Sequence, residues 1–197
     1  MDRRAQRRRD TSETRIRVDI TLDGQGNADI DTGIGFFDHM LAAFARHGLF
    51  ELTVNVEEGD LHVDAHHTIE DTGIVLGEAF REALGGKKGI RRFGWCLLPM
   101  DDALVRVALD LSGRPYLVYH VHPQSEQVGG VHVRLFREFF QAFVTSAGIN
   151  LHVSLLAGEE VHHIFEAVFK AVGKAADQAV THDPRIDVVP STKGNLA

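Results

Sequence analysis

The amino-acid sequence predicts an α+β fold built from two similar halves. Two copies of one pattern, a pair of histidines followed after two residues by a glutamate, begin at His66 and His162. Segments with the period of a strand and segments with the period of a helix occur in both halves, without strict strand-helix-strand alternation. We therefore expect two half-domains, each a small mixed four-stranded sheet with two helices on one face, with the helices packed between the sheets.

The internal repeat rests on the spacing of matching residues. A shift of 96 residues aligns the two His-His-x-x-Glu patterns and places Gly77 on Gly173. Upstream, a shift of 99 residues places His39 on Glu138, so each half offers one further residue of a metal-binding type. Two copies are too few for a solenoid and indicate a duplicated domain.

The expected boundaries follow from this repeat. The first half spans residues 13–89 and the second half residues 90–183, as parts of one integrated domain. The arginine-rich segment 1–12 is expected to be a solvated, disordered tail. Residues 184–197 carry no periodicity and are expected to form an extended C-terminal tail.

In the first half, apolar and polar residues alternate in short segments, which predicts strands. The expected strands cover residues 14–22, 28–31, 49–56 and 61–63. Apolar residues at helical spacing predict helices over 36–46 and 67–84. These helices are expected to end at Gly48 and Gly85, because glycine readily adopts the conformation that closes a helix.

The second half repeats this order of elements. The expected strands cover residues 93–98, 103–109, 116–120 and 150–156, and the expected helices cover 131–147 and 161–180. Proline and glycine predict turns between them, because both residues favour turn conformations. These turns are expected at Pro99, at Ser112-Gly113-Arg114-Pro115 and at Ala157-Gly158.

The composition is typical of a soluble globular protein. Hydrophobic residues make up 44% of the chain, yet no run approaches the ~18 apolar residues that a membrane span requires. The net charge of −7 argues against a nucleic-acid-binding protein. The single cysteine, Cys96, excludes an internal disulfide and a cysteine-rich zinc site. We expect a cytoplasmic protein whose 12 histidines require an explanation.

The two His-His-x-x-Glu patterns predict metal binding. On a helix, the second histidine and the glutamate project about 60° apart and can bind one ion, whereas the first histidine projects about 100° from the second. We therefore expect two metal sites, with ligands shared between subunits of an oligomer. The expected sets are His39, His67, Glu70 and His162 for one ion, and Glu138, His66, His163 and Glu166 for the other.

The type of ligand limits the choice of metal. Imidazole and carboxylate without thiolate suit Mn²⁺, Fe²⁺ or Zn²⁺. Octahedral Mn²⁺ or Fe²⁺ would keep two positions open for a substrate, as a catalytic site requires.

Three long motifs resemble those of the imidazoleglycerol-phosphate dehydratases of histidine biosynthesis. They are Gly33-Ile34-Gly35-Phe36-Phe37-Asp38-His39-Met40, Gly59-Asp60-Leu61-His62-Val63-Asp64-Ala65-His66-His67-Thr68-Ile69-Glu70-Asp71, and Pro190-Ser191-Thr192-Lys193-Gly194. The resemblance implies conversion of imidazole glycerol phosphate to imidazole acetol phosphate and water. It also implies two Mn²⁺ ions per active site, at the interfaces of an assembly of 24 subunits.

Three positions depart from the family pattern. Gly35 stands where the family usually has proline, and Phe37 replaces the usual leucine. Glu138 occupies a ligand position that is histidine in many members. Because glutamate is itself a good ligand of hard cations, we expect this metal site to persist with one more negative charge.

The resemblance also implies roles in catalysis and substrate binding. Metal at the imidazole nitrogens would acidify the ring and promote loss of the neighbouring hydroxyl, and a general acid or base would complete the proton transfers. The candidates for proton transfer beside the substrate are Glu13 and His47, with Asp101 as a weaker candidate. His47 is equally consistent with a simple helix end.

A phosphate ester needs cations and hydrogen-bond donors. The resemblance places these at Arg92, Arg114, Lys170, Ser191 and Lys193, which makes the C-terminal tail a phosphate-contacting segment. Without the resemblance, Arg114 would be interpreted as a turn residue and Lys170 as a charge on the surface of a helix.

Two alternatives use the same histidines. A metal-storage or metal-sensing cage would need the His-His-x-x-Glu groups, but not Arg92, Arg114, Ser191 and Lys193. A ferritin-like oxidase uses Glu-x-x-His on four long helices, whereas the order here is reversed and the predicted strands leave no room for that bundle.

Overall fold

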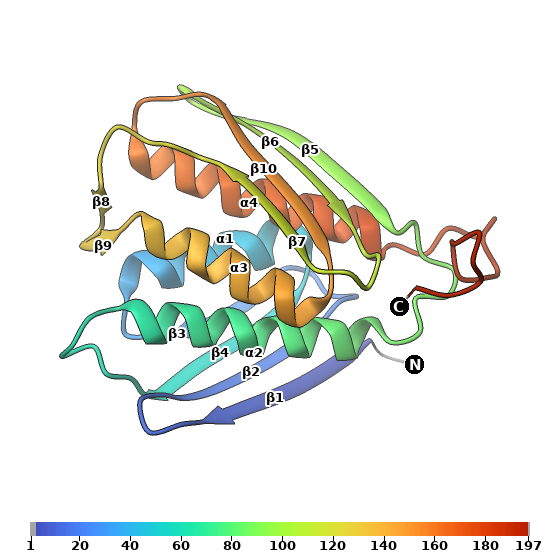
Figure 1. The fold of residues 1–197 in the computed structure, drawn as a ribbon, viewed down its shortest axis with the longest axis horizontal. Coiled ribbons are helices and arrows are strands. Elements are labelled where there is room, and N and C mark those ends of the chain that lie inside the picture. The colour runs from blue at the N-terminus through green and yellow to red at the C-terminus, as the bar shows by residue number, and fades with distance from the viewer. Residues whose placement is uncertain (1–2, 197) are drawn as a thin grey trace.

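The computed structural model describes residues 3–196 and confirms the predicted α+β fold. Figure 1 shows the two main sheets on opposite sides of the molecule, with the helices between them. Each sheet has four strands, and each half of the chain contributes one sheet and two helices. None of the described helices is long and apolar enough to cross a membrane.

The first half forms the sheet with strand order β1-β2-β4-β3. Its elements are β1 (Arg4–Asp10), β2 (Arg15–Thr21), β3 (Ala28–Asp31), α1 (Gly35–Gly48), β4 (Glu51–Glu58) and α2 (His66–Leu84). Strands β1, β2 and β4 pair antiparallel, whereas β3 pairs parallel with β4.

The second half has the same topology. Its elements are β5 (Phe93–Met100), β6 (Ala103–Asp110), β7 (Tyr116–His120), α3 (Arg134–Ala147), β10 (Asn150–Ala157) and α4 (Val161–Val180). The strand order β5-β6-β10-β7, with the same sequence of antiparallel and parallel pairings, matches the first sheet strand for strand. The predicted duplication is therefore a duplication of fold. A short hairpin, β8 (Gln127–Val128) with β9 (Val131–His132), precedes α3.

The prediction of a disordered arginine-rich tail is wrong for the described residues. Residues Arg4–Asp10 form strand β1, which pairs along its whole length with β2. Only Ala5 is buried, so the strand shows no apolar alternation that could reveal it. Carboxylates of neighbouring elements neutralise its arginines, as in the pairs Arg4–Asp19 and Arg8–Glu57.

Three local predictions also need correction. Residues 61–63 form a turn, and β1 takes the place of the expected fourth strand. Pro99 lies within β5, where it belongs to an edge strand that tolerates proline, and the turn follows at residues 101–102. Helix α3 begins at Arg134 because the residues before it belong to the β8–β9 hairpin.

Glycines of the repeat bring the central helices into close contact. A Cβ atom on Gly77 of α2 would lie within 3.0 Å of the carbonyl oxygen of Phe143 in α3, and one on Gly173 of α4 would lie equally close to that of Phe44 in α1. The two contacts join equivalent positions of the repeat. The two helix pairs, α2 with α3 and α1 with α4, are therefore equivalent across the molecule and fix how the halves meet.

Replacing Gly173 with alanine tests this contact. The added methyl group meets backbone of α1, which cannot rotate away, and overpacking of this kind typically costs about 1–3 kcal/mol. We expect a lower free energy of unfolding in urea, although alanine is the better helix former. Gly35→Ala is the matched control, because its Cβ would meet no atom within 4 Å. Equal stability of both variants would contradict the close-contact interpretation.

Candidate active site

Three side chains from two helices converge on one point. His39 of α1 and His162 of α4 each place Nε2 near Oε2 of Glu166, at 3.2 Å and 3.0 Å. Donor atoms on one metal ion with bonds of about 2.0–2.2 Å at right angles are roughly 3 Å apart. The chemistry and spacing of these atoms therefore fit a divalent cation with imidazole and carboxylate ligands.

This cluster corrects the predicted pairing within the His-His-x-x-Glu pattern. The glutamate lies against the first histidine, not the second, since Glu70 and His66 approach to 3.4 Å in the other copy as well. Side chains four positions apart differ by only about 40° around a helix, less than the 60° between positions three apart. Glu166 consequently lies with His39. The prediction that placed Glu166 in one ligand set with Glu138 is therefore wrong.

The carboxylate of Glu166 is held in its charged form. Burial opposes its ionisation, but Lys170, with Nζ at 2.7 Å, and His39 outweigh burial and lower the pKa of Glu166 to about 2. Lys170, a predicted phosphate ligand, therefore lies beside the cluster of His39, His162 and Glu166, the candidate metal-binding cluster. Burial, together with the positive charges of Lys170 and Lys174, lowers the pKa of His47 in α1.

The repeat supplies a second group of residues that is equivalent to the first cluster. The residues equivalent to His39, His162 and Glu166 are Glu138, His66 and Glu70. His66 and Glu138 line one cavity of about 770 Å³ between the start of α2 and the start of α3. Glu138 forms an ion pair with Arg137 at 3.2 Å, so its carboxylate is not drawn into a compact cluster as His39 is.

The second histidine of each pattern points to other carboxylates. Nδ1 of His67 lies 2.6 Å from Asp60, and Nδ1 of His163 lies 2.7 Å from Asp102. These hydrogen bonds raise the pKa of both histidines. The pKa of Asp102 lies well below its usual range because the backbone N–H groups of residues 159–160 and His163 all donate to it.

The two candidate acids at the hairpin tips occupy related places. Glu13 lies between β1 and β2, with Oε2 3.7 Å from Nδ1 of His67. Asp101 lies between the corresponding strands β5 and β6, with Oδ2 3.5 Å from Nε2 of His163. Both carboxylates are exposed, so both can reach a molecule outside this chain.

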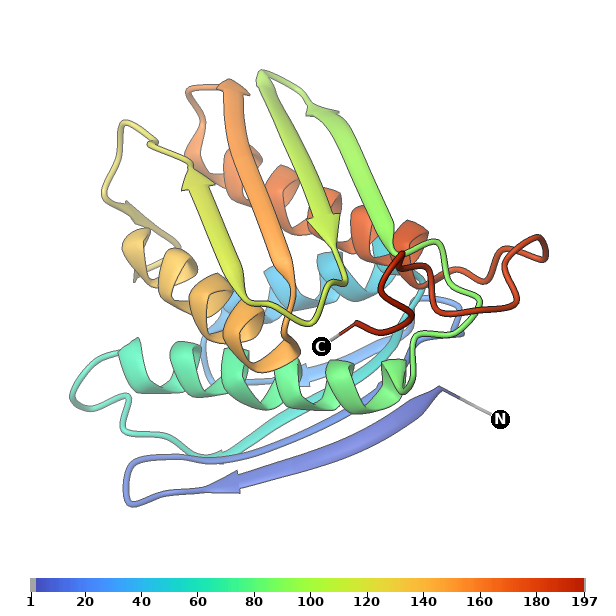
Figure 2. The same ribbon diagram turned by 45° about the vertical axis from the view of Figure 1, so that its right-hand side comes forward.

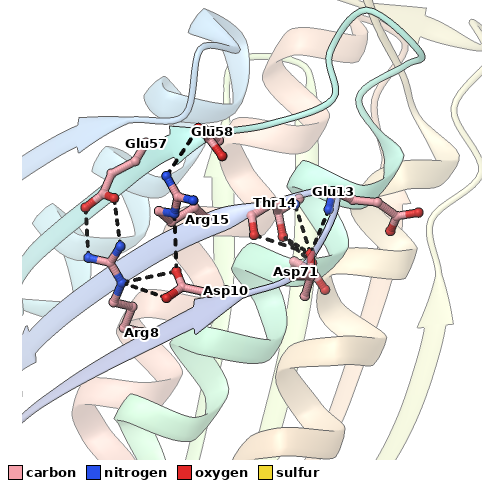
Figure 3. A network of polar contacts seen from close by, with 9 residues as sticks. Arg8, Asp10, Glu13, Thr14, Arg15, Glu57, Glu58 and Asp71 are labelled. Atoms are coloured by element: carbon pink, nitrogen blue, oxygen red, sulfur yellow. Dashed lines mark hydrogen bonds and ion pairs between the residues drawn. The ribbon is translucent and has the colours of Figure 1, made fainter.

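A buried carboxylate fixes the hairpin that carries Glu13 (Figure 3). Asp71 of α2 accepts a hydrogen bond of 2.5 Å from the hydroxyl of Thr14 and one of 3.0 Å from Nε of Arg9. The hydroxyl of Thr11 in turn accepts from the backbone N–H groups of Glu13 and Thr14. The tip is thereby tied to the helix that carries His66 and His67.

Four predicted phosphate ligands meet at the other end of the molecule. Arg92, Arg114, Ser191 and Lys193 line a cavity of about 320 Å³. Figure 2 shows the C-terminal tail folded back beside the start of β5. The guanidinium of Arg92 donates to the carbonyl oxygen of Pro190 at 2.8 Å and pairs with Asp110, which fixes the tail beside the strand. The arrangement can bind an oxyanion.

The cation-lined cavity and the candidate metal-binding cluster are far apart in one chain. The N–H of Arg92 donates to the carbonyl oxygen of Ala179 near the end of α4, 13 residues after Glu166. At ~1.5 Å per residue, this is about 20 Å along the helix. Figure 1 shows the C-terminal tail beside the C-terminal end of α4, whereas Glu166 belongs to the first two turns of that helix. A small substrate cannot touch both groups within one chain.

The aspartates that contact His67 and His163 are not among the functional residues predicted from the sequence. Asp60 lies within the second of the three motifs, but no role is predicted for it from the sequence. Asp102 stands beside Asp101, but only Asp101 is predicted from the sequence as a candidate for proton transfer. Alignment by burial could have found Asp102, because matching the buried residues of β2 and β6 places it on Glu13.

Replacing Thr14 with valine tests the tie between the hairpin and α2. The variant leaves buried Asp71 with one donor fewer, a loss that typically costs about 1–3 kcal/mol. We expect a lower free energy of unfolding in urea. Thr53→Val on the exposed face of β4 is the matched control, expected within about 0.5 kcal/mol of the unchanged protein. A Thr14 variant as stable as the control would show that the hydrogen bond contributes little.

Comparison with known proteins agrees with this architecture. The family model for imidazoleglycerol-phosphate dehydratase matches residues 32–176. The chain is 57% identical to the imidazoleglycerol-phosphate dehydratase of Caldanaerobacter subterraneus subsp. tengcongensis and 58% identical to that of Ruegeria pomeroyi. In both cases 98% of this chain and 100% of the relative are covered.

Solved structures show the same fold. The dehydratase of Staphylococcus aureus superposes with a TM-score of 0.82 at 38% identity, covering 91% of this chain and 99% of that one. The enzyme of Pyrococcus furiosus, in complex with (S)-C348, gives 0.80 at 38% identity, with 96% and 100% covered. The chain belongs to the imidazoleglycerol-phosphate dehydratase family and is a hydro-lyase.

Proposed function

We propose that this enzyme dehydrates imidazole glycerol phosphate to imidazole acetol phosphate in the biosynthesis of L-histidine, in the cytoplasm. The names of its relatives support the substrate. The observation that carries the proposal is the convergence of His39, His162 and Glu166 on one point. A metal cage could use this cluster, but it would have no use for the cation-lined cavity at the tail.

We further propose two Mn²⁺ ions per active site as cofactors. His39, His162 and Glu166 would hold one ion, and the equivalent residues Glu138, His66 and Glu70 the other. His67 and His163 would each complete a site in a neighbouring subunit. When bound at the imidazole of the substrate, the metal would acidify the ring and stabilise its anionic form.

The residues of the chain supply the proton transfers. The reaction removes a hydroxyl group and a proton from adjacent carbons, and the resulting enol becomes the ketone. Glu13 is an exposed carboxylate held by the clamped hairpin and acts as general acid or base. His47, whose lowered pKa favours the neutral ring at pH 7, can accept a proton. Asp101 is a third candidate, at the other hairpin, next to the residue that corresponds to Glu13.

The cavity at the tail would bind the phosphate. Arg114 and Lys193 are exposed there, and Ser191 offers a hydroxyl donor. Arg92 is already paired with Asp110 and with the carbonyl oxygen of Pro190. Its part is therefore to fix the tail and to add positive charge, whereas Lys193 is the more available contact. Lys170 would act through Glu166 and not through the phosphate.

We propose that each active site is built by more than one subunit. The distance of about 20 Å along α4 prevents one chain from presenting both its cluster and its cavity to one small substrate. The chain therefore has to act as a homo-oligomer. The resemblance to its family supports an assembly of 24 subunits. The acidic net charge of −7 offers no support for binding of nucleic acid.

Turnover by the metal-stripped protein tests the proposed function. The protein is incubated with imidazole glycerol phosphate, with and without added Mn²⁺, and imidazole acetol phosphate is quantified. We expect product only with metal, and none from His163→Ala. His120→Ala, an exposed histidine on β7, should retain activity. Metal-bound, assembled protein without turnover would contradict the proposal.

Replacing Lys193 with alanine tests the phosphate cavity. Loss of one cation should raise KM for the phosphorylated substrate by roughly 10-fold or more, with a smaller change in kcat, because the contact acts in binding. The matched control is Lys88→Ala, an exposed lysine outside the cavity. A KM that stays the same in both variants would remove the tail from the substrate site.

A further inference from the structure

The histidines of the two patterns are held in two different ways. His66 and His162 turn Nε2 toward the glutamate of their own helix. His67 and His163 turn Nδ1 toward an aspartate from another segment: Asp60 from the loop before α2, and Asp102 from the β5–β6 turn. The two aspartates are not equivalent in the repeat, so the same contact is made by two separate means.

The chemistry of the contact sets the tautomer of each ring. A carboxylate can only accept hydrogen bonds, so Nδ1 of His67 and of His163 must carry the proton. The lone pair of the neutral ring is then on Nε2. Metal-binding histidines commonly donate their other N–H to a carboxylate, which fixes ring orientation and increases ligand basicity.

Both aspartates are themselves held in place. Only 12% of the Asp60 side chain is exposed, which limits the orientations it can adopt. Asp102 uses Oδ1 for His163 and Oδ2 for the backbone N–H groups of residues 159 and 160, at 2.6 Å and 2.9 Å. The turn between β5 and β6 is thereby fastened to the start of α4.

We propose that Asp60 and Asp102 are positioning residues that orient His67 and His163, so that Nε2 of each ring is the atom presented to a divalent cation. The inference rests on the proposed metal dependence. It adds two residues outside the candidate ligand set, and it names the ring atom that each histidine uses. His67 and His163 thus differ from His66 and His162, whose Nε2 atoms lie beside the glutamate of their own helix.

Binding of Mn²⁺ to stripped protein tests this proposal without any turnover. Free Mn²⁺ is measured from its electron paramagnetic resonance signal during titration of Asp60→Asn and Asp102→Asn. We expect affinity to fall about 10–100-fold in each variant. The amide oxygen at position 102 can still accept from the backbone N–H groups, so the start of α4 is preserved. Asp64→Asn is the matched control, because the Asp64 carboxylate accepts a hydrogen bond from the backbone N–H of His66 and not from a histidine ring.

Thermal unfolding of the metal-free variants separates positioning from stability. Weak Mn²⁺ binding with an unchanged Tm supports the proposal. Binding within about twofold of the unchanged protein overturns it, and so does a loss of binding that accompanies a lower metal-free Tm, because the aspartates would then be structural. If the unchanged protein itself binds no Mn²⁺, the proposed metal dependence fails first and the positioning role fails with it.

Discussion

The contact between helices α1 and α4 is the constraint on which the candidate metal site depends. Gly173 lets α4 approach the backbone of α1 at Phe44. Toward the N-terminus, about one and a half turns before Phe44 in α1 and about two turns before Gly173 in α4, His39 meets Glu166. The two helices therefore run in the same direction across the contact, and their spacing sets the distance between the ligands. A duplicated contact at Gly77 holds α2 on α3 in the same manner.

Much of this arrangement could be predicted because it follows from local periodicity. The duplicated topology, the four central helices and the second sheet were all visible as alternating or helical spacing of apolar residues. Strand β1 was not, because its face is covered by ion pairs and offers only Ala5 as a buried residue. Its stability comes from pairing with β2 and from distant carboxylates, which no local pattern records.

The candidate site shows the same limit. The sequence predicts imidazole and carboxylate ligands but not their grouping. In the structure Glu166 lies with His39 and His162, because positions four apart on a helix are the nearer neighbours. The contacts of His67 with Asp60 and of His163 with Asp102 cross between separate segments. Lys170 neutralises Glu166, although its position had suggested a phosphate ligand. Each of these outcomes depends on tertiary packing.

In each chain α4 separates the cluster of His39, His162 and Glu166 from the cation-lined cavity, so that one small substrate cannot contact both. The central claim is that neighbouring subunits combine the cluster and the cavity, and mixed oligomers test it most directly. Chains carrying His162→Ala are co-expressed with chains carrying Ser191→Ala and Lys193→Ala, and dehydration is measured in purified mixed assemblies. The account predicts activity above that of either variant alone. Mixed assemblies no more active than their separate components would contradict it.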